Sequence, residues 1–152
     1  MYQPPALLKG RVFFSLQAYP YPTGVYPPSP MAKHLETGAN GEALAANYLV
    51  QQGVEILQRN YRYKHWEIDL VARHAGELVF VEVKTRQQGS LARPEEQLPP
   101  QKRATLVQCA QAYLMEHPAA ETLPARFDLV AVEVAKGRPP LVRWHKAAFR
   151  PD

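Results

Sequence analysis

Two acidic side chains and a lysine interrupt an otherwise apolar part of the chain. Asp69 lies in the segment WEIDLVAR, and Glu82 and Lys84 lie in the next apolar segment, ELVFVEVKT. Segments of this kind form buried strands, and a buried strand rarely tolerates an unpaired charge. Two carboxylates beside a lysine could instead hold a divalent cation such as Mg²⁺ or Mn²⁺ and orient a water molecule against a phosphate group.

The turn between the two segments decides whether these side chains meet. The sequence RHAGEL carries the turn signal, and a turn centred on Ala75 and Gly76 would pair His74 with Glu77. Alanine is strained at the positive φ of a two-residue hairpin turn. We therefore expect a four-residue loop over these positions, which keeps the same register. A three-residue loop would instead reverse the faces of one strand relative to the other.

This register gives the hairpin one apolar face and one charged face, because side chains alternate along a strand. Directly opposed side chains have Cβ atoms about 5 Å apart, so Asp69 and Glu82 would repel each other unless a cation lies between them. A divalent cation is therefore predicted there. The apolar face pairs Ile68 with Val83, Leu70 with Val81 and Ala72 with Val79, and the other face pairs Val71 with Phe80, Asp69 with Glu82 and Glu67 with Lys84.

Glu42 and Lys84 could complete such a site, and each has an ordinary structural alternative. Glu42 begins the apolar stripe of a predicted helix, so it could face the sheet, or it could merely complement the positive end of the helix dipole. Lys84 shares the face of Glu82 and could activate a water molecule or stabilise charge on a phosphate. The alternative is an ion pair with Glu67 at the end of the sheet, which would contribute little to stability.

The elements that must position these residues follow from the apolar periodicity and the turn signals. The expected helices cover 37–52, capped by Thr37 or Asn40 and ended by Gly53, and 101–117. The expected strands cover 54–65, 66–73, 77–85, 126–134 and 140–148, with a loop over 86–100. The order α-β-β-β-α-β-(β) predicts an α/β fold with one mixed sheet flanked by helices on both faces.

Composition is that of an ordinary globular protein with a moderately basic surface. The 152 residues suffice for one domain, and a formal charge of +4 with a pI near 9.3 is compatible with polyanion binding without requiring it. Cys109 is the only cysteine, so no intrachain disulfide can form, and the scattered histidines lack zinc-site spacing. No apolar run approaches the roughly 20 residues that cross a bilayer, so we expect a cytoplasmic protein that binds no membrane.

The first thirty residues differ from the rest of the chain, because they hold seven of its fifteen prolines. The run YPYPTGVYPPSP cannot form a regular hydrogen-bond ladder and should be extended or disordered, with a ligand for a proline-binding partner as the functional alternative. Ordered patterning begins at Met31, which makes this residue a candidate for the native start. The prediction is a Pro-rich extension over 1–30 and a single domain over 31–152.

Basic side chains gather near the Glu82 segment and could contact the phosphates of a nucleic acid. Cations at the start of a helix oppose its dipole, which would suit a place where an anionic backbone binds. The alternative is solvated surface charge. Tyr61 and Tyr63 could stack on bases, although packing in the core is the expected role. The basic candidates are Arg86 and Arg93 in the loop, Lys102 and Arg103 at the start of the second helix, and Arg59, Arg62 and Lys64 on the first strand.

Five blocks of sequence in a fixed order resemble one protein family. The blocks are GANGEALAANYL, NYRYKHWEIDLVAR, LVFVEVKTR, RPEEQLPPQKRATL and RFDLVAV, and together they cover about residues 38–134. They resemble the YraN family of small bacterial proteins, and the order Asp69, Glu82, Lys84 resembles the D…(D/E)xK signature of the PD-(D/E)xK nuclease superfamily. The chain departs from the family pattern at Trp66, where glycine is usual, and at Gln97, where a small residue is usual. On the predicted register Trp66 faces the apolar side beside Thr85.

The resemblance implies a restriction-endonuclease-like core and metal-dependent hydrolysis of DNA, with a similarity to archaeal Holliday-junction resolvases that favours branched DNA and a two-fold dimer. It implies that Asp69, Glu82 and the carbonyl of Val83 are metal ligands, with Lys84 as the catalytic lysine and Glu42 as the helix-borne acid. The alternatives are a non-catalytic nucleic-acid-binding or scaffold protein with the same fold, and a nuclease that acts on RNA.

Overall fold

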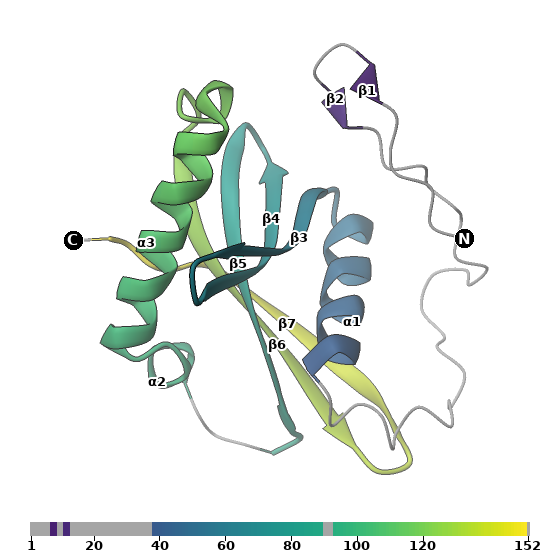
Figure 1. Cartoon of the computed structure of the whole chain (residues 1–152). Coiled ribbons are helices and arrows are strands. Elements are labelled where there is room, and N and C mark those ends of the chain that lie inside the picture. The colour runs from purple at the N-terminus through teal and green to yellow at the C-terminus, as the bar shows by residue number, and fades with distance from the viewer. Residues whose placement is uncertain (1–6, 9–10, 13–37, 90–92, 152) are drawn as a thin grey trace.

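The computed structural model describes residues 7–8, 11–12, 38–89 and 93–151 (Figure 1). Near the start of the chain, β1 (Leu7–Leu8) and β2 (Arg11–Val12) pair as a short antiparallel ladder. The remainder of the Pro-rich extension predicted over 1–30 lies outside the described residues. None of the described helices combines the length and the apolar character needed to cross a bilayer.

A five-stranded sheet forms the centre of the domain, in the order β3-β4-β5-β6-β7. Neighbouring strands are antiparallel except for β5 and β6, which are parallel. A parallel pair needs a long crossover connection, and here the chain crosses from β5 to β6 through a helix. The strands are β3 (Glu55–Tyr63), β4 (Trp66–His74), β5 (Glu77–Gln87), β6 (Ala125–Ala135) and β7 (Arg138–Phe149).

The two main helices, α1 (Gly38–Gln51) and α3 (Pro100–Glu116), pack on opposite faces of the sheet (Figure 1). This confirms the predicted α/β arrangement and element order. The loop predicted over 86–100 contains a short helix, α2 (Pro94–Gln97), and a 3₁₀ turn (Pro118–Ala120) follows α3. Of the two predicted caps, Asn40 falls inside the bounds of α1 and Thr37 lies outside the described residues.

One apolar cluster fills the space between each helix and the sheet. The apolar stripe predicted for the first helix faces the sheet, and Cys109 of α3 is fully buried on the opposite face. Beneath α1, Ala45, Ala46 and Leu49 pack on Leu70, Ala72, Val79, Val81, Val130 and Val132. Beneath α3, Leu106, Cys109, Ala110 and Tyr113 pack on Ile68, Val71, Phe80, Phe127 and Leu129.

The β4–β5 turn has the predicted register but not the predicted loop. The ladder runs to the pair His74–Glu77, and Ala75 and Gly76 alone form the turn, with φ of 50° and 79°. Positive φ at both central residues is typical of a type I′ turn. The four-residue loop was therefore a wrong prediction. The strain at Ala75 is tolerated because the guanidinium of Arg126 contacts both His74 and Glu77 and holds the hairpin closed.

The alternation of β4 reverses at Asp69. Ile68 packs beneath α3, whereas Leu70 packs beneath α1, so the expectation of one apolar face through both residues was wrong. Asp69 accepts a hydrogen bond from the backbone N–H of Val83, at 2.7 Å. The ladder between β4 and β5 ends at Leu70–Val81, and the pairs predicted beyond it, Ile68–Val83, Asp69–Glu82 and Glu67–Lys84, are absent from it.

The reversal has a physical cause on the neighbouring strand. Asn60 of β3 adopts a left-handed conformation, with φ of 51°. It lies opposite Asp69, because the flanking pairs are Arg59–Leu70 and Tyr61–Ile68. A left-handed residue inside a strand disturbs its pleat and re-aims the side chains that follow. At this point the sheet therefore brings together polar side chains that a regular pleat would place on opposite faces.

Candidate functional site

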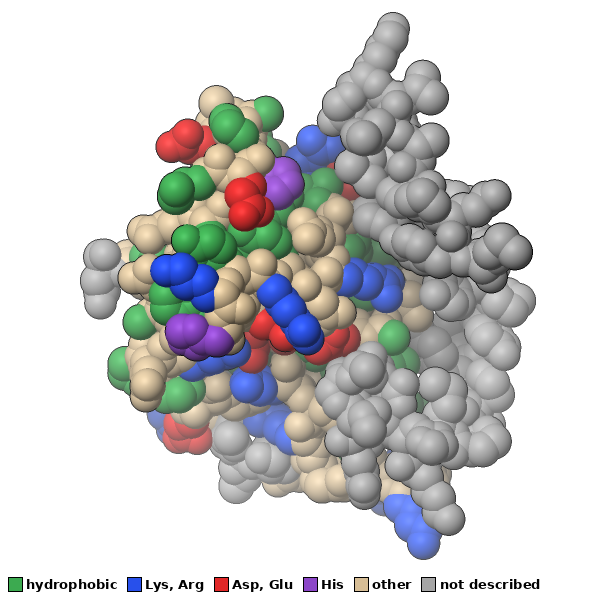
Figure 2. All heavy atoms as spheres, viewed as in Figure 1, with side chains coloured by type: hydrophobic (Ala, Val, Ile, Leu, Met, Phe, Trp, Pro, Cys, Tyr) green, Lys and Arg blue, Asp and Glu red, His purple; other side chains and the backbone are tan. Residues whose placement is uncertain are grey.

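Three carboxylates converge where the pleat is disturbed. Glu42 from α1 and Glu67 and Asp69 from β4 each place one oxygen within 4.8 Å of the others. In Figure 2, carboxylates and basic side chains lie side by side near the middle of the face shown. Glu42 therefore meets the strand acid as predicted from the helical stripe. Glu67 was predicted only as a partner for Lys84, and it pairs instead with Arg62, at 3.0 Å.

A close approach of α1 to the sheet brings Glu42 to this position. Gly41 is buried at the start of α1, and a Cβ atom there would lie only 2.0 Å from the hydroxyl oxygen of Thr85 on β5. A glycine is therefore required for the helix to pack this tightly. The side chain that follows, Glu42, projects beside the β4 acids as a result.

Replacing Gly41 with alanine is expected to push α1 away from β5 and to lower the free energy of unfolding by about 1–3 kcal/mol, as in other overpacked cores. Chemical denaturation followed by circular dichroism would measure the change. The double variant Gly41→Ala/Thr85→Ala should recover most of the loss, because it removes the hydroxyl that the new methyl group meets. A single variant as stable as the parent would contradict the packing argument.

Asp69 interacts electrostatically with both Glu82 and Glu42. Burial, followed by the charge of Glu82 and then that of Glu42, raises the pKa of Asp69 to about 7, against the lowering effect of the Val83 hydrogen bond and of Lys102. Burial and the nearby Glu67 likewise raise the pKa of Glu42. Burial and the acidic neighbours therefore both oppose ionisation of these carboxyl groups, and a cation placed among them would offset both effects.

Glu82 faces the α3 side of the sheet and is only 4% exposed. Its Oε1 atom is 3.1 Å from Nζ of Lys84 and 3.2 Å from Nζ of Lys102, which reaches it from α3. Its Oε2 atom is buried and has no hydrogen-bond partner among the described residues. A buried carboxylate oxygen left without a donor is destabilising, so this atom has an unused capacity to bind a cation.

The predicted phosphate-binding residues have different environments. Lys102 is bound to Glu82, as described above. The Arg86 side chain is 16% exposed and pairs with Glu133, at 2.8 Å, and this contact lowers the pKa of Glu133. Arg103 donates to the carbonyl of Leu98, at 2.6 Å, and lies over the ring of Phe149. Arg93 is exposed and directly precedes α2.

The aromatic residues of the β3–β4 hairpin divide between core and surface. Tyr61 is buried, and its hydroxyl donates to Glu116, at 3.0 Å, which confirms its expected core role. Tyr63 is half-buried and stacks on Trp66, with ring centroids 6.2 Å apart. Trp66 packs against the α3-side cluster, whereas Thr85 meets Gly41 on the α1 side. The prediction that Trp66 lies beside Thr85 was therefore wrong, because β4 reverses its faces after this residue.

Two residues of the site were not predicted from the sequence, Glu67 as a member of the acid cluster and Asn60 as its neighbour. Neither role can be predicted without knowing that the pleat of β4 reverses at Asp69. The one available signal was Asn60 itself, because asparagine adopts the left-handed conformation more readily than other residues with a side chain.

Comparison with known proteins places the chain in a family. A family model described as uncharacterised protein family UPF0102 matches residues 41–132, which contain every residue of the site. A UPF0102 protein of Saccharophagus degradans is 39% identical over 119 residues, which are 78% of this chain and 97% of that protein. One of Xanthomonas campestris is 40% identical over 121 residues, 80% of this chain and 97% of its own length. One of Lachnoclostridium phytofermentans is 46% identical over 102 residues, 67% of this chain and 86% of its own length. The family predicted from the sequence blocks is confirmed, and the chain belongs to the uncharacterised protein family UPF0102.

Proposed function

We propose that this protein is a divalent-cation-dependent nuclease that hydrolyses phosphodiester bonds in DNA, with branched or otherwise structured DNA as the expected substrate. The observation that carries the proposal is the environment of Glu82. One oxygen of this buried carboxylate is shared by two lysines, and the other has no hydrogen-bond partner in the part of the chain that the structure describes. A buried polar atom without a partner calls for an explanation, and a bound ion is one that suits a carboxylate.

The available donors suit a hard cation such as Mg²⁺ or Mn²⁺, which prefers carboxylate and carbonyl oxygens. Asp69 and Glu82 would hold the cation, with Glu42 and the carbonyl of Val83 as further ligands. When bound, the cation supplies Lewis-acid stabilisation of the phosphoryl group and acidifies water at neutral pH. Glu42 and Asp69 converge within the acid cluster, Glu82 interacts electrostatically with Asp69, and the burial of Glu82 partly excludes solvent.

Lys84 is the side chain expected to contact the substrate. Its ammonium lies at Glu82 while the side chain remains 40% exposed, so it reaches both the site and an incoming phosphate. It can donate a hydrogen bond to a non-bridging phosphate oxygen and stabilise the negative charge that develops there. Lys102 contacts the same oxygen of Glu82 from α3 and thereby fixes the orientation of that carboxylate.

A second candidate is a non-catalytic nucleic-acid-binding protein that retains the fold. The observation in its favour is that Lys84 and Lys102 can neutralise Glu82 without a cation. The basic side chains near the site would then serve binding alone, through phosphate contacts that weaken as salt is added.

A cleavage assay with Mg²⁺ or Mn²⁺ tests the proposal. The substrates are a supercoiled plasmid, a four-way DNA junction and an RNA of matched sequence, each incubated with the full chain. Asp69→Asn and Lys84→Ala should each lower the cleavage rate by about 100-fold or more while binding of the junction persists. Lys136→Ala is the matched control, because Lys136 is an exposed lysine in the β6–β7 turn, and it should cleave like the parent.

The outcomes separate the candidates. Metal-dependent cleavage of DNA that both site variants lose supports the nuclease. Salt-sensitive binding without cleavage by the parent, in either metal, supports the binding protein. Cleavage confined to the RNA would retain the chemistry and correct the substrate.

A further inference from the structure

Asn60 combines an unusual backbone conformation with an exposed polar side chain, at the point where the pleat of the sheet is disturbed. It is an exposed residue in the middle of β3, yet it has φ of 51°. Residues other than glycine adopt this conformation at a cost, and asparagine does so with the least difficulty. The conformation accompanies the reversal of the pleat, but the exposed Asn60 side chain adds nothing to the apolar core, so the choice of asparagine here needs another explanation. The strained position lies directly opposite Asp69.

The Asn60 amide connects the helix-borne acid to the strand acids. A carboxylate can only accept hydrogen bonds, so the amide nitrogen, with two hydrogens, must face the two glutamates. In that orientation it donates to Oε2 of Glu42, at 2.8 Å, and to Oε1 of Glu67, at 2.9 Å. The other oxygen of Glu67 accepts from Nε of Arg62, at 3.0 Å. Both oxygens of Glu67 are therefore fixed, and Glu42 is tied to them through Asn60.

A neutral donor suits this position better than a cation would. Asn60 reduces the repulsion between Glu42 and Glu67 through two hydrogen bonds but leaves their negative charges in place. Lysine or arginine here would neutralise the acids and compete with a divalent ion for them. An amide therefore keeps the carboxylates together and still attractive to a cation.

We propose that Asn60 is a positioning residue of the candidate cation site, and that its left-handed backbone aims the amide between Glu42 and Glu67. The inference rests on the proposed function, because it assigns Asn60 to the cation site described there. Residues that orient metal ligands commonly contribute 10- to 100-fold to metal affinity. Asn60 would act through the ligand Glu42, which it ties to Glu67, and would touch neither the cation nor the substrate.

The test is a titration of the full chain with Mn²⁺ alone. Binding is measured by calorimetry and, independently, by the rise in melting temperature. Asn60→Gly removes the amide but accepts the positive φ, so it should fold, and we expect its Kd for Mn²⁺ to increase by about 10-fold or more. Ala75→Gly is the matched control, because it makes the same relief of a left-handed residue in the β4–β5 turn (φ 50°). Its Kd should equal that of the parent.

A second variant tests the amide contacts without any metal. Asn60→Asp keeps the size and the left-handed tendency but places a further carboxylate against Glu42 and Glu67. In EDTA at pH 8 it should melt at a lower temperature than Asn60→Gly, and addition of Mn²⁺ should narrow that difference. Equal melting temperatures of these two variants in EDTA, or an unchanged Kd in Asn60→Gly, would overturn the role of Asn60 but leave the cation site standing. A parent chain that binds no Mn²⁺ would overturn the cation site and the proposed function with it.

Discussion

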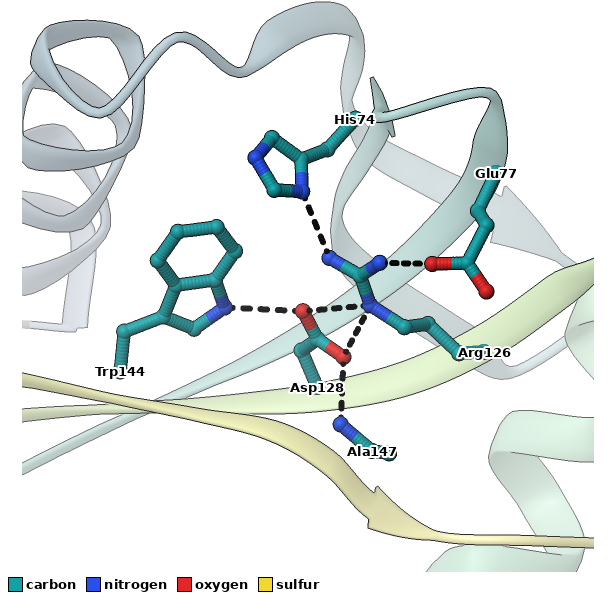
Figure 3. Close-up of polar contacts among 6 residues, drawn as sticks. All are labelled: His74, Glu77, Arg126, Asp128, Trp144 and Ala147. Carbon is teal, nitrogen blue, oxygen red and sulfur yellow. Dashed lines mark hydrogen bonds and ion pairs between the residues drawn. The ribbon is translucent and has the colours of Figure 1, made fainter.

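Replacement of Asp128 with alanine is expected to lower the free energy of unfolding by about 3–5 kcal/mol, the usual effect of removing one partner from a buried ion pair. Asp128 is 1% exposed on β6. Its carboxylate accepts from Nε of Arg126 at 3.0 and 3.2 Å, from the indole N–H of Trp144 at 2.8 Å and from the backbone N–H of Ala147 at 2.9 Å (Figure 3). Alanine would leave all three donors without this acceptor.

The network joins three parts of the sheet, which explains the size of the expected effect. Arg126 also contacts His74, at 3.1 Å, and Glu77, so it links β6 to the β4–β5 turn (Figure 3). Ala147 has a φ of 49°, at the irregularity where the pairing of β6 with β7 shifts register. The carboxylate therefore holds both a strained turn and a strained edge strand in place.

Urea denaturation of the full chain would measure the loss. Asp128→Asn should have a smaller effect, because the amide keeps the shape and one acceptor oxygen. Glu55→Ala is the surface control: Glu55 pairs with Arg73 across β3 and β4, with side chains 49% and 42% exposed. Its change should stay within about 0.5 kcal/mol. If Asp128→Ala were as mild as this control, the network would be dispensable.

The framework of the site could be predicted from the sequence because it depends on local periodicity. The apolar stripe of α1 placed Glu42 on the sheet-facing side, and the turn signal around Gly76 gave the register of β4 with β5. Both features depend on the spacing of neighbouring residues along one segment. The mixed sheet was likewise predicted from the order of the elements, because a helix between two strands provides the crossover that a parallel pair needs.

The details of the site could not be predicted, because they depend on residues from other strands. Ile68 and Leu70 have the spacing of one strand face, and only the left-handed Asn60 across the sheet separates them. The same holds for the Asp128 network outside the site. Asp128 lies in an apolar segment that gives no sign of its partners, because Trp144 and Ala147 come from β7. Periodicity within a segment carries no information about a disturbance imposed by its neighbour.

Asp69→Asn is expected to stabilise the cation-free protein at pH 8 by on the order of 3–4 kcal/mol and to have little effect near pH 4. The pKa of Asp69 is raised from an ordinary 3.8 to about 7 in the folded state, chiefly by burial and by Glu82. At a pH between these two pKa values, Asp69 holds a proton in the folded chain that it has released in the unfolded chain. Stability from this group is therefore complete below about pH 4 and is lost as the pH rises through 7. The amide of asparagine has no charge to lose, and its oxygen can still accept the hydrogen bond from Val83.

Urea denaturation in EDTA at several pH values between 4.5 and 8 measures this difference between variant and parent. Glu121→Gln, at an exposed glutamate, is the control and should follow the parent at every pH. Addition of Mg²⁺ or Mn²⁺ at pH 8 should then reverse the order. A cation neutralises the ionised Asp69 of the parent and raises its stability through binding, whereas the variant has lost that ligand. A parent that stays below the variant at saturating Mn²⁺ would show that the carboxylate of Asp69 does not bind the ion. A gain from Asp69→Asn that is the same at pH 4.5 and at pH 8 would show that the charge of Asp69 is not its source.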